Sequence, residues 1–212
     1  MNTKTVDFII EELEKLYPAA ECALAYEGEP WKLLVMARLS AQCTDKRVNT
    51  VSEILFEKYK TLDELADADI KDIEDIIKPC GLYKVKARNI KDECAMIRGE
   101  FNGVIPDNME DLLKLPGVGR KIANLIIGDI FKKPAVVTDT HCIRISGRLG
   151  FCGGNVKDPL RIERILADVI PPEKQSDFCH RLVLFGRDVC SARSPKCGVC
   201  PFTEICVAFV IK

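Results

Sequence analysis

Apolar side chains recur at helical spacing along almost the entire chain, and this pattern constrains the fold more than any other feature. One face of the first segment carries apolar residues three and four apart until Pro18, where a helix must end. Similar spacing predicts further helices at residues 30–41, 84–101, 107–113, 120–131, 140–149, 159–169 and 174–187. Only residues 135–137 resemble a strand, and that stretch is too short for a sheet. The sequence therefore predicts an all-α fold.

Two capping signals add helix starts between these segments. Thr44 can cap the helix that follows it. Thr61 and Glu64 fit a capping box, in which the hydroxyl and the carboxylate satisfy two backbone amides. A run of isoleucines at helical spacing comes next and ends before Pro79 and Gly81. We therefore expect further helices after Thr44, after Thr61 and over the isoleucine run.

The composition excludes several classes of protein. The chain has 212 residues, of which 47% are hydrophobic, so it can bury the core of one large domain or two small ones. No apolar run approaches the roughly 20 residues of a transmembrane helix, and the polar residues 1–7 lack the apolar stretch of a signal peptide. We therefore expect an unexported protein of the cytoplasm. The net charge of −1 excludes a uniformly basic surface, although local clustering can still give a basic face.

The segment Leu115-Pro116-Gly117-Val118-Gly119 lies between two predicted short helices. Pro116 ends the first helix, and the glycines permit positive φ and close approach of the backbone to a ligand. Amides at Gly117 and Gly119, next to the amino end of the following helix, form a natural phosphate site. The pattern is typical of a helix-hairpin-helix, which binds the DNA backbone without reading its sequence. An ordinary tight turn between helices is the alternative.

Lys121 falls in the first turn of the helix after this segment. A cation is mildly unfavourable at the amino end of a helix, and a solvated lysine is the plain interpretation. The functional interpretation is a nucleophilic amine. Partial burial and the neighbouring cation Arg120 would both favour its neutral, reactive form.

Asp139 follows an apolar run and precedes a predicted helix. This local pattern is that of an N-cap carboxylate. A carboxylate held in this way also suits proton transfer or the stabilisation of a positive charge that develops on a sugar, and the two roles are compatible. His141 can line a pocket, with a satisfied structural histidine as the alternative.

Eleven cysteines are unusual in an unexported chain, where disulfides are not expected. Most of them are scattered and are interpreted as small buried hydrophobic residues. Structural zinc usually uses paired C-x2–4-C knuckles, whereas iron–sulfur clusters accept four unevenly spaced thiolates. Four cysteines near the carboxyl end have the uneven spacing C-x6-C-x2-C-x5-C, which predicts a metal site and favours iron–sulfur over zinc: Cys190, Cys197, Cys200 and Cys206.

Three motifs in this order resemble the endonuclease III family of helix-hairpin-helix DNA glycosylases: LPGVGRK at residues 115–121, VTDTH at residues 137–141, and the four-cysteine loop. The resemblance extends through LSAQCTD at residues 39–45 and GLYK at residues 81–84, so it covers nearly the whole chain. It implies two helical lobes with a DNA-binding cleft between them. A six-helix barrel with the hairpin would occupy residues 22–133. An iron–sulfur cluster lobe would combine residues 1–21 with residues 134–212.

The resemblance also implies a role for each candidate residue. Lys121 matches the catalytic lysine of the family and Asp139 its catalytic aspartate. The four cysteines match the ligands of a [4Fe–4S] cluster, which is structural or redox-linked and not the seat of hydrolysis. The remaining positions are expected to contact DNA, either by filling the gap left by an extruded base (Gln42 and Leu82) or at the hairpin and beside the aspartate (Gly117, Gly119, Arg120 and His141).

The implied activity is that of a bifunctional DNA N-glycosylase and AP lyase of base excision repair. Its substrates would be oxidised or ring-saturated pyrimidines in double-stranded DNA, together with abasic sites. A monomer associated with the nucleoid would carry out the reaction. Lys121 would attack the sugar, expel the base and form a Schiff base, and β-elimination would then cut the strand.

Two alternatives remain open at this point. Adenine mismatch glycosylases share the hairpin, the aspartate and the iron–sulfur loop, but relatives that only remove the base generally lack the lysine. A noncatalytic iron–sulfur protein that binds DNA or senses redox state would have lost Lys121 or Asp139, and this sequence has both. Ile122 stands where the family often has a threonine, a departure that affects the start of the helix and not the chemistry.

Overall fold

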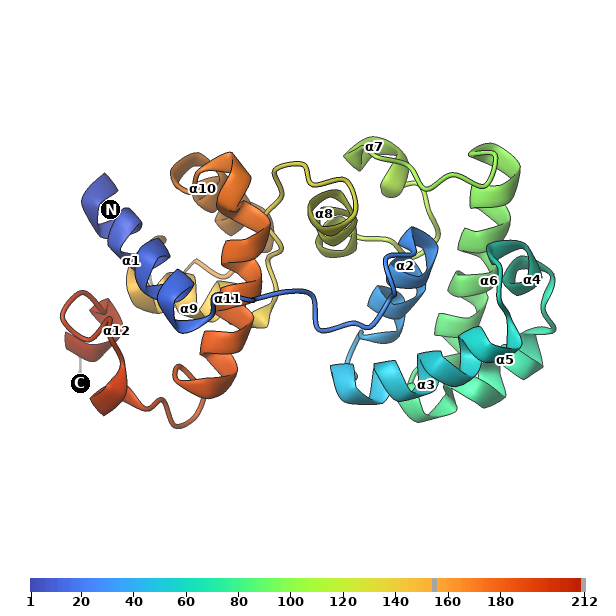
Figure 1. Ribbon diagram of the computed structural model, residues 1–212, viewed down its shortest axis with the longest axis horizontal. Helices are drawn as coiled ribbons and strands as arrows, with labels where there is room; N and C mark the ends of the chain where they lie inside the picture. The colour runs from blue at the N-terminus through green and yellow to red at the C-terminus, as the bar shows by residue number, and fades with distance from the viewer. Residues whose placement is uncertain (154–155, 211–212) are drawn as a thin grey trace. The chain divides into compact units, whose positions relative to one another are not determined.

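The computed structural model describes residues 1–153 and 156–210 and is built from helices. The α-helices are α1 (Thr3–Leu16), α2 (Pro30–Leu39), α3 (Asp45–Lys58), α4 (Leu62–Asp67), α5 (Ile70–Ile77), α6 (Tyr83–Glu100), α7 (Met109–Leu112), α8 (Arg120–Asp129), α9 (Thr140–Leu149), α10 (Pro159–Val169), α11 (Gln175–Asp188) and α12 (Val207–Val210) (Figure 1). Short 3-10 helices are η1 (Lys78–Cys80), η2 (Pro172–Lys174) and η3 (Cys197–Val199). No strand occurs among the described residues, and the predicted all-α fold is confirmed.

The chain folds into two compact units. The first, called the hairpin unit below, comprises Ala23–Phe131. The second, called the cysteine unit, combines Met1–Cys22 with Lys132–Lys212. The chain therefore begins in the cysteine unit with α1, builds the whole hairpin unit, and returns after α8.

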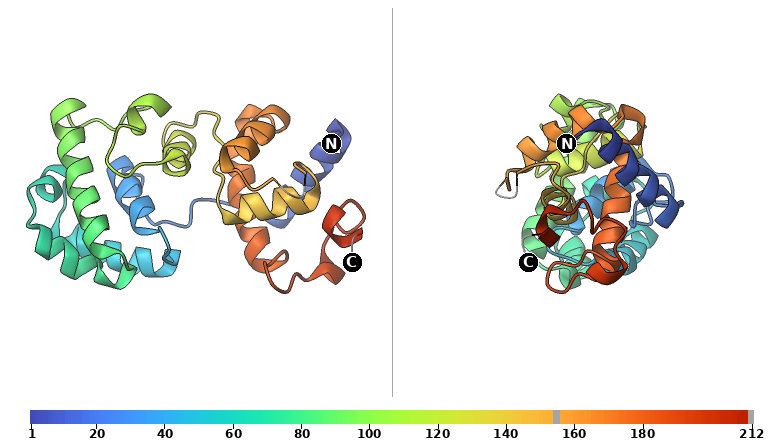
Figure 2. Two further views of the ribbon diagram at one scale, coloured as in Figure 1. Left: turned by 180° about the vertical axis from the view of Figure 1, so that it is seen from behind. Right: turned by 90° about the vertical axis from the view of Figure 1, so that its left-hand side faces the viewer.

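In the hairpin unit, α2 supplies the central apolar surface. Its sequence is apolar on nearly all sides, and Leu33–Ala37 and Leu39 are buried. The long helix α6 packs along α4 and α5, as the views from front and back agree (Figures 1 and 2). Its buried stripe includes Ile90, Cys94 and Ile97 at helical spacing. These helices form the frame that carries α7 and α8.

The predicted capping signals define real helix starts. The Thr44 hydroxyl accepts a hydrogen bond from the Arg47 amide at 3.4 Å, and the Thr61 hydroxyl accepts one from the Glu64 amide at 3.1 Å. The second arm of the capping box differs from the expectation. The Glu64 carboxylate accepts from the Lys60 amide at 2.6 Å, one residue before the cap. The helix start is thus satisfied from both sides as predicted, with the carboxylate shifted by one amide.

Helix ends differ from the prediction by one or two residues. The helix predicted over residues 30–41 ends at Leu39, because Ser40 closes it by donating from its hydroxyl to the Ala37 carbonyl at 2.8 Å. Such differences are common where the last turn tightens or frays. The short helix α12 was outside the prediction, since four residues are too few to show a period.

The cysteine unit has an aromatic core that joins the two ends of the chain. Phe185 of α11 packs edge-on against Phe202, with ring centroids 5.3 Å apart, and Phe8 of α1 packs against the same ring at 6.1 Å. Phe151 and Phe178 form a second edge-on pair at 5.8 Å. Helix α11 packs against both α1 and α9 (Figure 2). The loop that carries the cysteines is therefore anchored to a buried core through Phe202.

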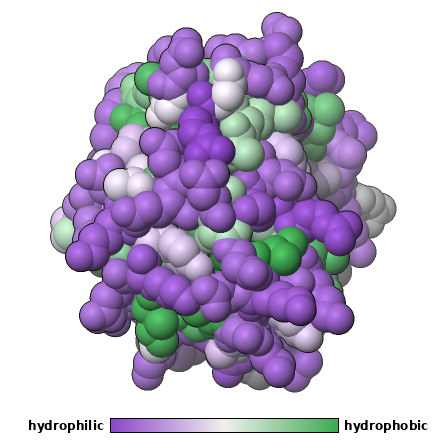
Figure 3. Space-filling view, turned by 90° about the vertical axis from the view of Figure 1, so that its right-hand side faces the viewer, coloured by the Kyte–Doolittle hydropathy of each residue, from purple (hydrophilic) through white to green (hydrophobic). Residues whose placement is uncertain are grey.

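Within the described residues, no helix is both long enough and apolar enough to span a lipid bilayer. The face shown in Figure 3 is mainly hydrophilic, and its apolar side chains lie in separate small groups.

Candidate functional site

The glycine segment joins α7 to α8 in a tight turn, so the predicted helices on both sides of it are confirmed. The Val118 amide donates to the Leu115 carbonyl at 3.0 Å, and Gly117 has φ of 75°, in the left-handed region that favours glycine. Gly119 is the N-cap of α8 with φ of −102°, so its role is not a positive φ. No side chain caps this end of α8. Both glycines are exposed, as an anion site on the backbone requires.

The space under Gly117 is filled by polar side chains of the same unit. A Cβ atom built on Gly117 would lie 2.6 Å from Nη2 of Arg38 and from Nδ2 of Asn89. Nη2 of Arg38 also lies 3.5 Å from the Pro116 carbonyl oxygen. The hairpin turn thus rests on a guanidinium, and glycine at position 117 allows that close approach.

Glu93 is the carboxylate whose charge acts on Arg38. It is completely buried, and neither of its carboxylate oxygens has a hydrogen-bond partner in the described part of the chain. Burial raises the pKa of Glu93 to about 8, and the charge of Arg38 opposes that rise. Burial likewise lowers the pKa of Arg38, with Glu93 acting in the other direction. A partly compensated buried pair therefore lies beneath the hairpin.

Lys121 is the second residue of α8 and its side chain is exposed. The partial burial expected for its amine is not found, because this turn of α8 projects Lys121 away from the apolar face formed by Ala123, Ile126 and Ile127. The amine is instead accessible beside the glycine turn. An accessible amine on a rigid helix start can reach a ligand bound to the turn.

Gln42 and Leu82 share an unusual backbone conformation. Both are exposed, Leu82 by 57%, and their φ values of 55° and 49° lie in the left-handed region. Residues other than glycine pay roughly 1–2 kcal/mol for this conformation, and it is often found at functional sites. Both side chains are thus held out from short turns, at the end of α2 and at the start of α6.

Asp139 caps α9, as one of the two interpretations predicted. Its Oδ1 atom accepts a hydrogen bond from the Cys142 amide at 2.7 Å, and the residue is half-buried. This bond fixes the carboxylate group at the start of the helix and involves only one of its two oxygens. The capping role and a role in proton transfer are therefore compatible.

His141 lies one residue into the same helix and contacts Arg144. Nη2 of Arg144 is 3.1 Å from Nδ1 of His141, and because a guanidinium can only donate, Nδ1 must accept. A Cβ atom on Gly186 of α11 would lie 2.3 Å from this nitrogen, so the glycine makes room for the ring. The ring orientation is set by these two neighbours.

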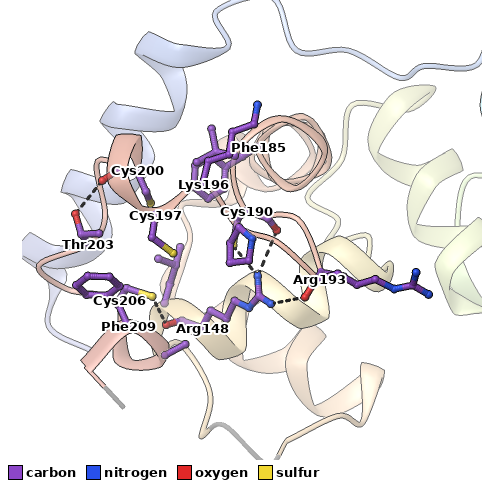
Figure 4. Close-up of a pocket in the computed structure, with 15 residues that line it drawn as sticks. Arg148, Phe185, Cys190, Arg193, Lys196, Cys197, Cys200, Thr203, Cys206 and Phe209 are labelled. Atoms are coloured by element: carbon purple, nitrogen blue, oxygen red, sulfur yellow. Dashed lines mark hydrogen bonds between the residues drawn. The ribbon is translucent and has the colours of Figure 1, made fainter. Parts of the chain in front are cut away.

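The four predicted cysteines line one pocket of about 260 Å³ in the cysteine unit (Figure 4). Cys190 follows α11, Cys197 begins η3, Cys200 directly follows η3, and Cys206 directly precedes α12. Burial raises the pKa of the Cys200 thiol, and charges on the other three sulfur atoms act in the same direction. All four cysteines therefore lie around the same pocket.

The chemistry of these four thiols suits an iron–sulfur cluster. A zinc ion needs all four ligands at one centre, whereas each thiolate of a [4Fe–4S] cluster binds a different iron atom. Four thiols spread around one pocket match the second requirement.

Arg148 bonds the loop that carries the cysteines to helix α9. Its guanidinium lies 3.2 Å from the Cys190 sulfur and donates to the Ser191 and Ala192 carbonyls at 2.8 and 3.0 Å (Figure 4). The sulfur of Cys206 lies 3.3 Å from the Arg148 carbonyl oxygen. Arg148 therefore bonds both the backbone of this loop and the Cys190 sulfur to α9.

The candidate residues divide between the two units. The hairpin unit holds one set: Gln42, Leu82, Gly117, Gly119, Arg120 and Lys121. The cysteine unit holds the other: Asp139, His141, Cys190, Cys197, Cys200 and Cys206. In the cysteine unit, the structure gathers the four cysteines around one pocket.

Sequence reasoning missed the charged residues inside the hairpin unit. Lys86 and Glu93 are buried on the apolar stripe of α6, and Arg38 lies under the hairpin. The available signal was a charge at a stripe position, since Lys86, Ile90 and Glu93 follow helical spacing. A charge on an otherwise apolar stripe predicts a buried polar contact.

Two family models match this chain. A model of the HhH-GPD superfamily base excision DNA repair protein matches residues 35–172, and the iron-sulfur binding domain of endonuclease III matches residues 190–206. Endonuclease III of Bacillus subtilis is 41% identical over 97% of this chain and 93% of its own length. Endonuclease III of Synechocystis is 46% identical over 92% of this chain and 88% of its own length. A trapped covalent intermediate of endonuclease III with DNA superimposes with a TM-score of 0.94 at 40% identity, covering 100% of this chain and 98% of the other.

These matches establish the class of protein. The chain belongs to the HhH-GPD superfamily of base excision DNA repair proteins and, within it, to the endonuclease III family. It is a base excision repair enzyme with DNA glycosylase and AP lyase activity, it binds DNA, and its cofactor is a [4Fe–4S] cluster. The resemblance identified from the sequence is confirmed.

Proposed function

We propose that this enzyme removes oxidised or ring-saturated pyrimidines from duplex DNA and cuts the strand through a Schiff base on Lys121. The observation that carries the proposal is the position of Lys121, whose exposed amine stands on the first turn of α8 directly after the glycine turn. A phosphate held by the turn would bring the sugar of a neighbouring nucleotide to this amine.

The glycine turn binds the DNA backbone in this proposal. Exposed backbone at Gly117 and Gly119 and the uncapped start of α8 offer amide donors to a phosphate, and Arg120 adds a positive charge. Such contacts carry no sequence information, which suits an enzyme that must find damage anywhere. Recognition of the lesion must come from elsewhere.

The lesion becomes accessible by extrusion of its nucleotide. A base inside a duplex cannot be reached, and flipping it out costs less when the base is damaged. Gln42 and Leu82 then fill the gap, since both are exposed and project from turns. His141 is proposed to contact the DNA near Asp139.

The chemistry follows from an amine and a carboxylate. The neutral amine of Lys121 attacks C1′ of the sugar, the glycosidic bond breaks, and its electron pair leaves with the base, which takes up a proton. The sugar ring opens to give the Schiff base. Loss of a proton from C2′ then expels the 3′ phosphate, which cuts the strand on the 3′ side of the lesion. Lysine is regenerated when water hydrolyses the Schiff base.

Asp139 assists these steps by moving protons and by stabilising positive charge on the sugar. Its cap on α9 holds the carboxylate in one orientation. The four cysteines would hold the [4Fe–4S] cluster, which when bound stabilises their loop and takes no part in hydrolysis. We further propose a monomer that works at the nucleoid in the cytoplasm, where its DNA substrate lies.

Borohydride trapping tests the proposal. Reduction of the Schiff base on duplex DNA that contains thymine glycol should give a covalent protein–DNA adduct with the unmodified enzyme and none with Lys121→Ala. Lys114→Ala is the matched control, because Lys114 is also an exposed lysine of the hairpin but pairs with Asp111 at 2.7 Å. An equal yield of adduct from Lys121→Ala, or none from the unmodified enzyme with its cluster intact, would overturn the assignment.

A further inference from the structure

A single buried lysine connects the two turns that carry Gln42 and Leu82. Lys86 lies in the first turn of α6, and its side chain is 3% exposed. Its Nζ atom donates to the carbonyls of Leu39, Ala41 and Cys80, each at 2.8 Å. An ammonium group has three donors, so these contacts use all of them.

The three carbonyls belong to the segments that precede the two exposed residues. Leu39 is the last residue of α2 and Ala41 directly precedes Gln42. Cys80 ends η1, two residues before Leu82. The amide of Lys86 also donates to the Leu82 carbonyl at 3.0 Å. One residue is therefore bonded to both turns by its side chain and to the second by its backbone.

The contact also explains how a charge is tolerated in the interior. Burial lowers the pKa of Lys86 from its ordinary value, which by itself would favour the neutral amine. The Leu39 and Cys80 carbonyls lie at the ends of α2 and η1, where carbonyl oxygens carry partial negative charge and have no partners within the helix. Hydrogen bonds from the charged form of Lys86 to these two carbonyls and to that of Ala41 offset the cost of burial.

We infer that Lys86 is a positioning residue for base extrusion: its ammonium, bonded to the Leu39, Ala41 and Cys80 carbonyls, sets the relative placement of Gln42 and Leu82. The inference rests on the proposed role of these two residues in filling the gap in the duplex. Both have left-handed backbone, so their turns need outside contacts to keep that conformation. Lys86 supplies those contacts from a rigid helix.

The same helix contains a second lysine that makes a matched comparison. Lys91 of α6 donates to the carbonyls of Ala66 and Ala68 at 2.9 and 2.6 Å, where α4 ends. Lys91 thus has the same structural role as Lys86, because each ammonium group donates hydrogen bonds to carbonyls where a helix ends. Its partners precede no exposed left-handed residue. Replacing Lys91 therefore measures the structural cost of losing such a lysine, without an effect on Gln42 or Leu82.

A duplex and a single-stranded substrate together distinguish an effect on the placement of Gln42 and Leu82 from an effect on the stability of the protein. A duplex requires a base to be extruded and the gap to be filled, whereas a single strand with an abasic site requires neither. Both substrates need Lys121 for cleavage. The ratio of cleavage rates on duplex and single strand, measured on one preparation, is insensitive to any unfolded fraction because that fraction affects both rates equally.

The experiment compares Lys86→Met with Lys91→Met in the cluster-loaded enzyme. We expect Lys86→Met to lower the ratio of kcat on thymine glycol duplex to kcat on the single-stranded abasic oligonucleotide by about tenfold or more, the size of effect expected from a small misplacement. Lys91→Met should leave the ratio unchanged. Lys86→Arg should recover part of it, since a guanidinium can donate to several carbonyls.

Leu82→Ala provides the reference for a lost gap-filling residue, and the double variant with Lys86→Met should show no further drop in the ratio. An unchanged ratio in Lys86→Met, or an equal fall in Lys91→Met, would overturn the inference. Failure of the proposed function looks different: the unmodified enzyme would cleave neither substrate, or Leu82→Ala would leave the ratio intact.

Discussion

The hairpin and the cysteine loop reach a defined shape by different means. The hairpin turn rests on side chains of its own unit, with Arg38 and Asn89 filling the space under Gly117. The cysteine loop, residues 190–206, contains the short helix η3, and Phe202 is its buried anchor. Its sulfur atoms surround a pocket, and Arg148 holds its backbone from outside.

This difference shows which interactions stabilise each of the two sites. Packing and buried charges organise the hairpin, so its geometry is a property of the polypeptide. The cysteine loop buries little of its own surface, and we expect it to depend on metal–thiolate bonds, as small metal-bound segments generally do. Changes in the two regions should therefore have different consequences for DNA cleavage.

Loss of one cluster ligand should have the largest effect. Cys200→Ser should lose bound iron, visible absorbance and DNA cleavage together, because the loop has little else to hold its shape. Cys152→Ala is the control, since Cys152 is a buried cysteine of the same unit outside the loop. Iron content, absorbance and cleavage are measured on both. Full iron content and activity in Cys200→Ser would contradict the dependence of the loop on the cluster.

Substitutions at Asp139 should distinguish its role as the cap of α9 from its role in catalysis. Asparagine caps a helix about as well as aspartate but carries no charge, so Asp139→Asn should keep the unfolding free energy and lose on the order of a hundredfold in kcat. Asp139→Ala should lose the same activity and about 1 kcal/mol of stability as well. Urea unfolding and single-turnover kinetics check the two effects. Normal kcat in Asp139→Asn would mean that the residue is only a cap.

The two hairpin glycines should respond differently to alanine. Gly117→Ala should cost about 1–2 kcal/mol because of its left-handed backbone, and it would also displace Arg38. Gly119→Ala should cost less than Gly117→Ala, because φ of −102° suits alanine and nothing beyond the neighbouring residues lies within 4 Å of the added Cβ, so only the N-cap preference for glycine is lost. Both should weaken binding to undamaged duplex, which fluorescence anisotropy measures. Equal stability of the two variants would show that the packing under Gly117 is not rigid.

Glu93 should affect how the free energy of unfolding depends on pH, without a direct effect on DNA cleavage. Folding raises its pKa from 4.5 to about 8, so the folded protein holds this proton more tightly than the unfolded chain. Its favourable contribution is complete below about pH 4.5 and is lost as the pH rises through about 8. Glu93→Gln should therefore show a smaller decline in unfolding free energy over that range. The exposed Glu57→Gln is the control, and identical slopes in all three proteins would contradict the effect.

Much of the fold was predictable because its signals are local. The predicted helices at 140–149 and 159–169 coincide with α9 and α10, and each starts at a capping aspartate, Asp139 and Asp158. The cysteine spacing and the glycine turn are likewise local patterns with a direct chemical meaning. Local residue type therefore suffices where a short stretch of chain satisfies its own backbone.

The remainder depends on contacts between distant segments. Nothing in the local sequence requires a left-handed Gln42 or Leu82. The Ala41 and Cys80 carbonyls, which lie just before these two residues, accept hydrogen bonds from the buried Lys86, and this contact forms only in the folded unit. The exposure of Lys121 also differs from the expectation of partial burial, since burial is decided by packing and not by position in a turn. Polar contacts of this kind follow only when the tertiary structure is known.

The most direct test of the account is to locate the DNA attachment on the protein. The borohydride-reduced adduct with duplex DNA that contains thymine glycol would be digested with protease and nuclease and sequenced by tandem mass spectrometry. The account predicts the residual sugar mass on Lys121, within the first turn of α8. A modification on Lys114, on Lys132 or on the amino terminus would contradict it.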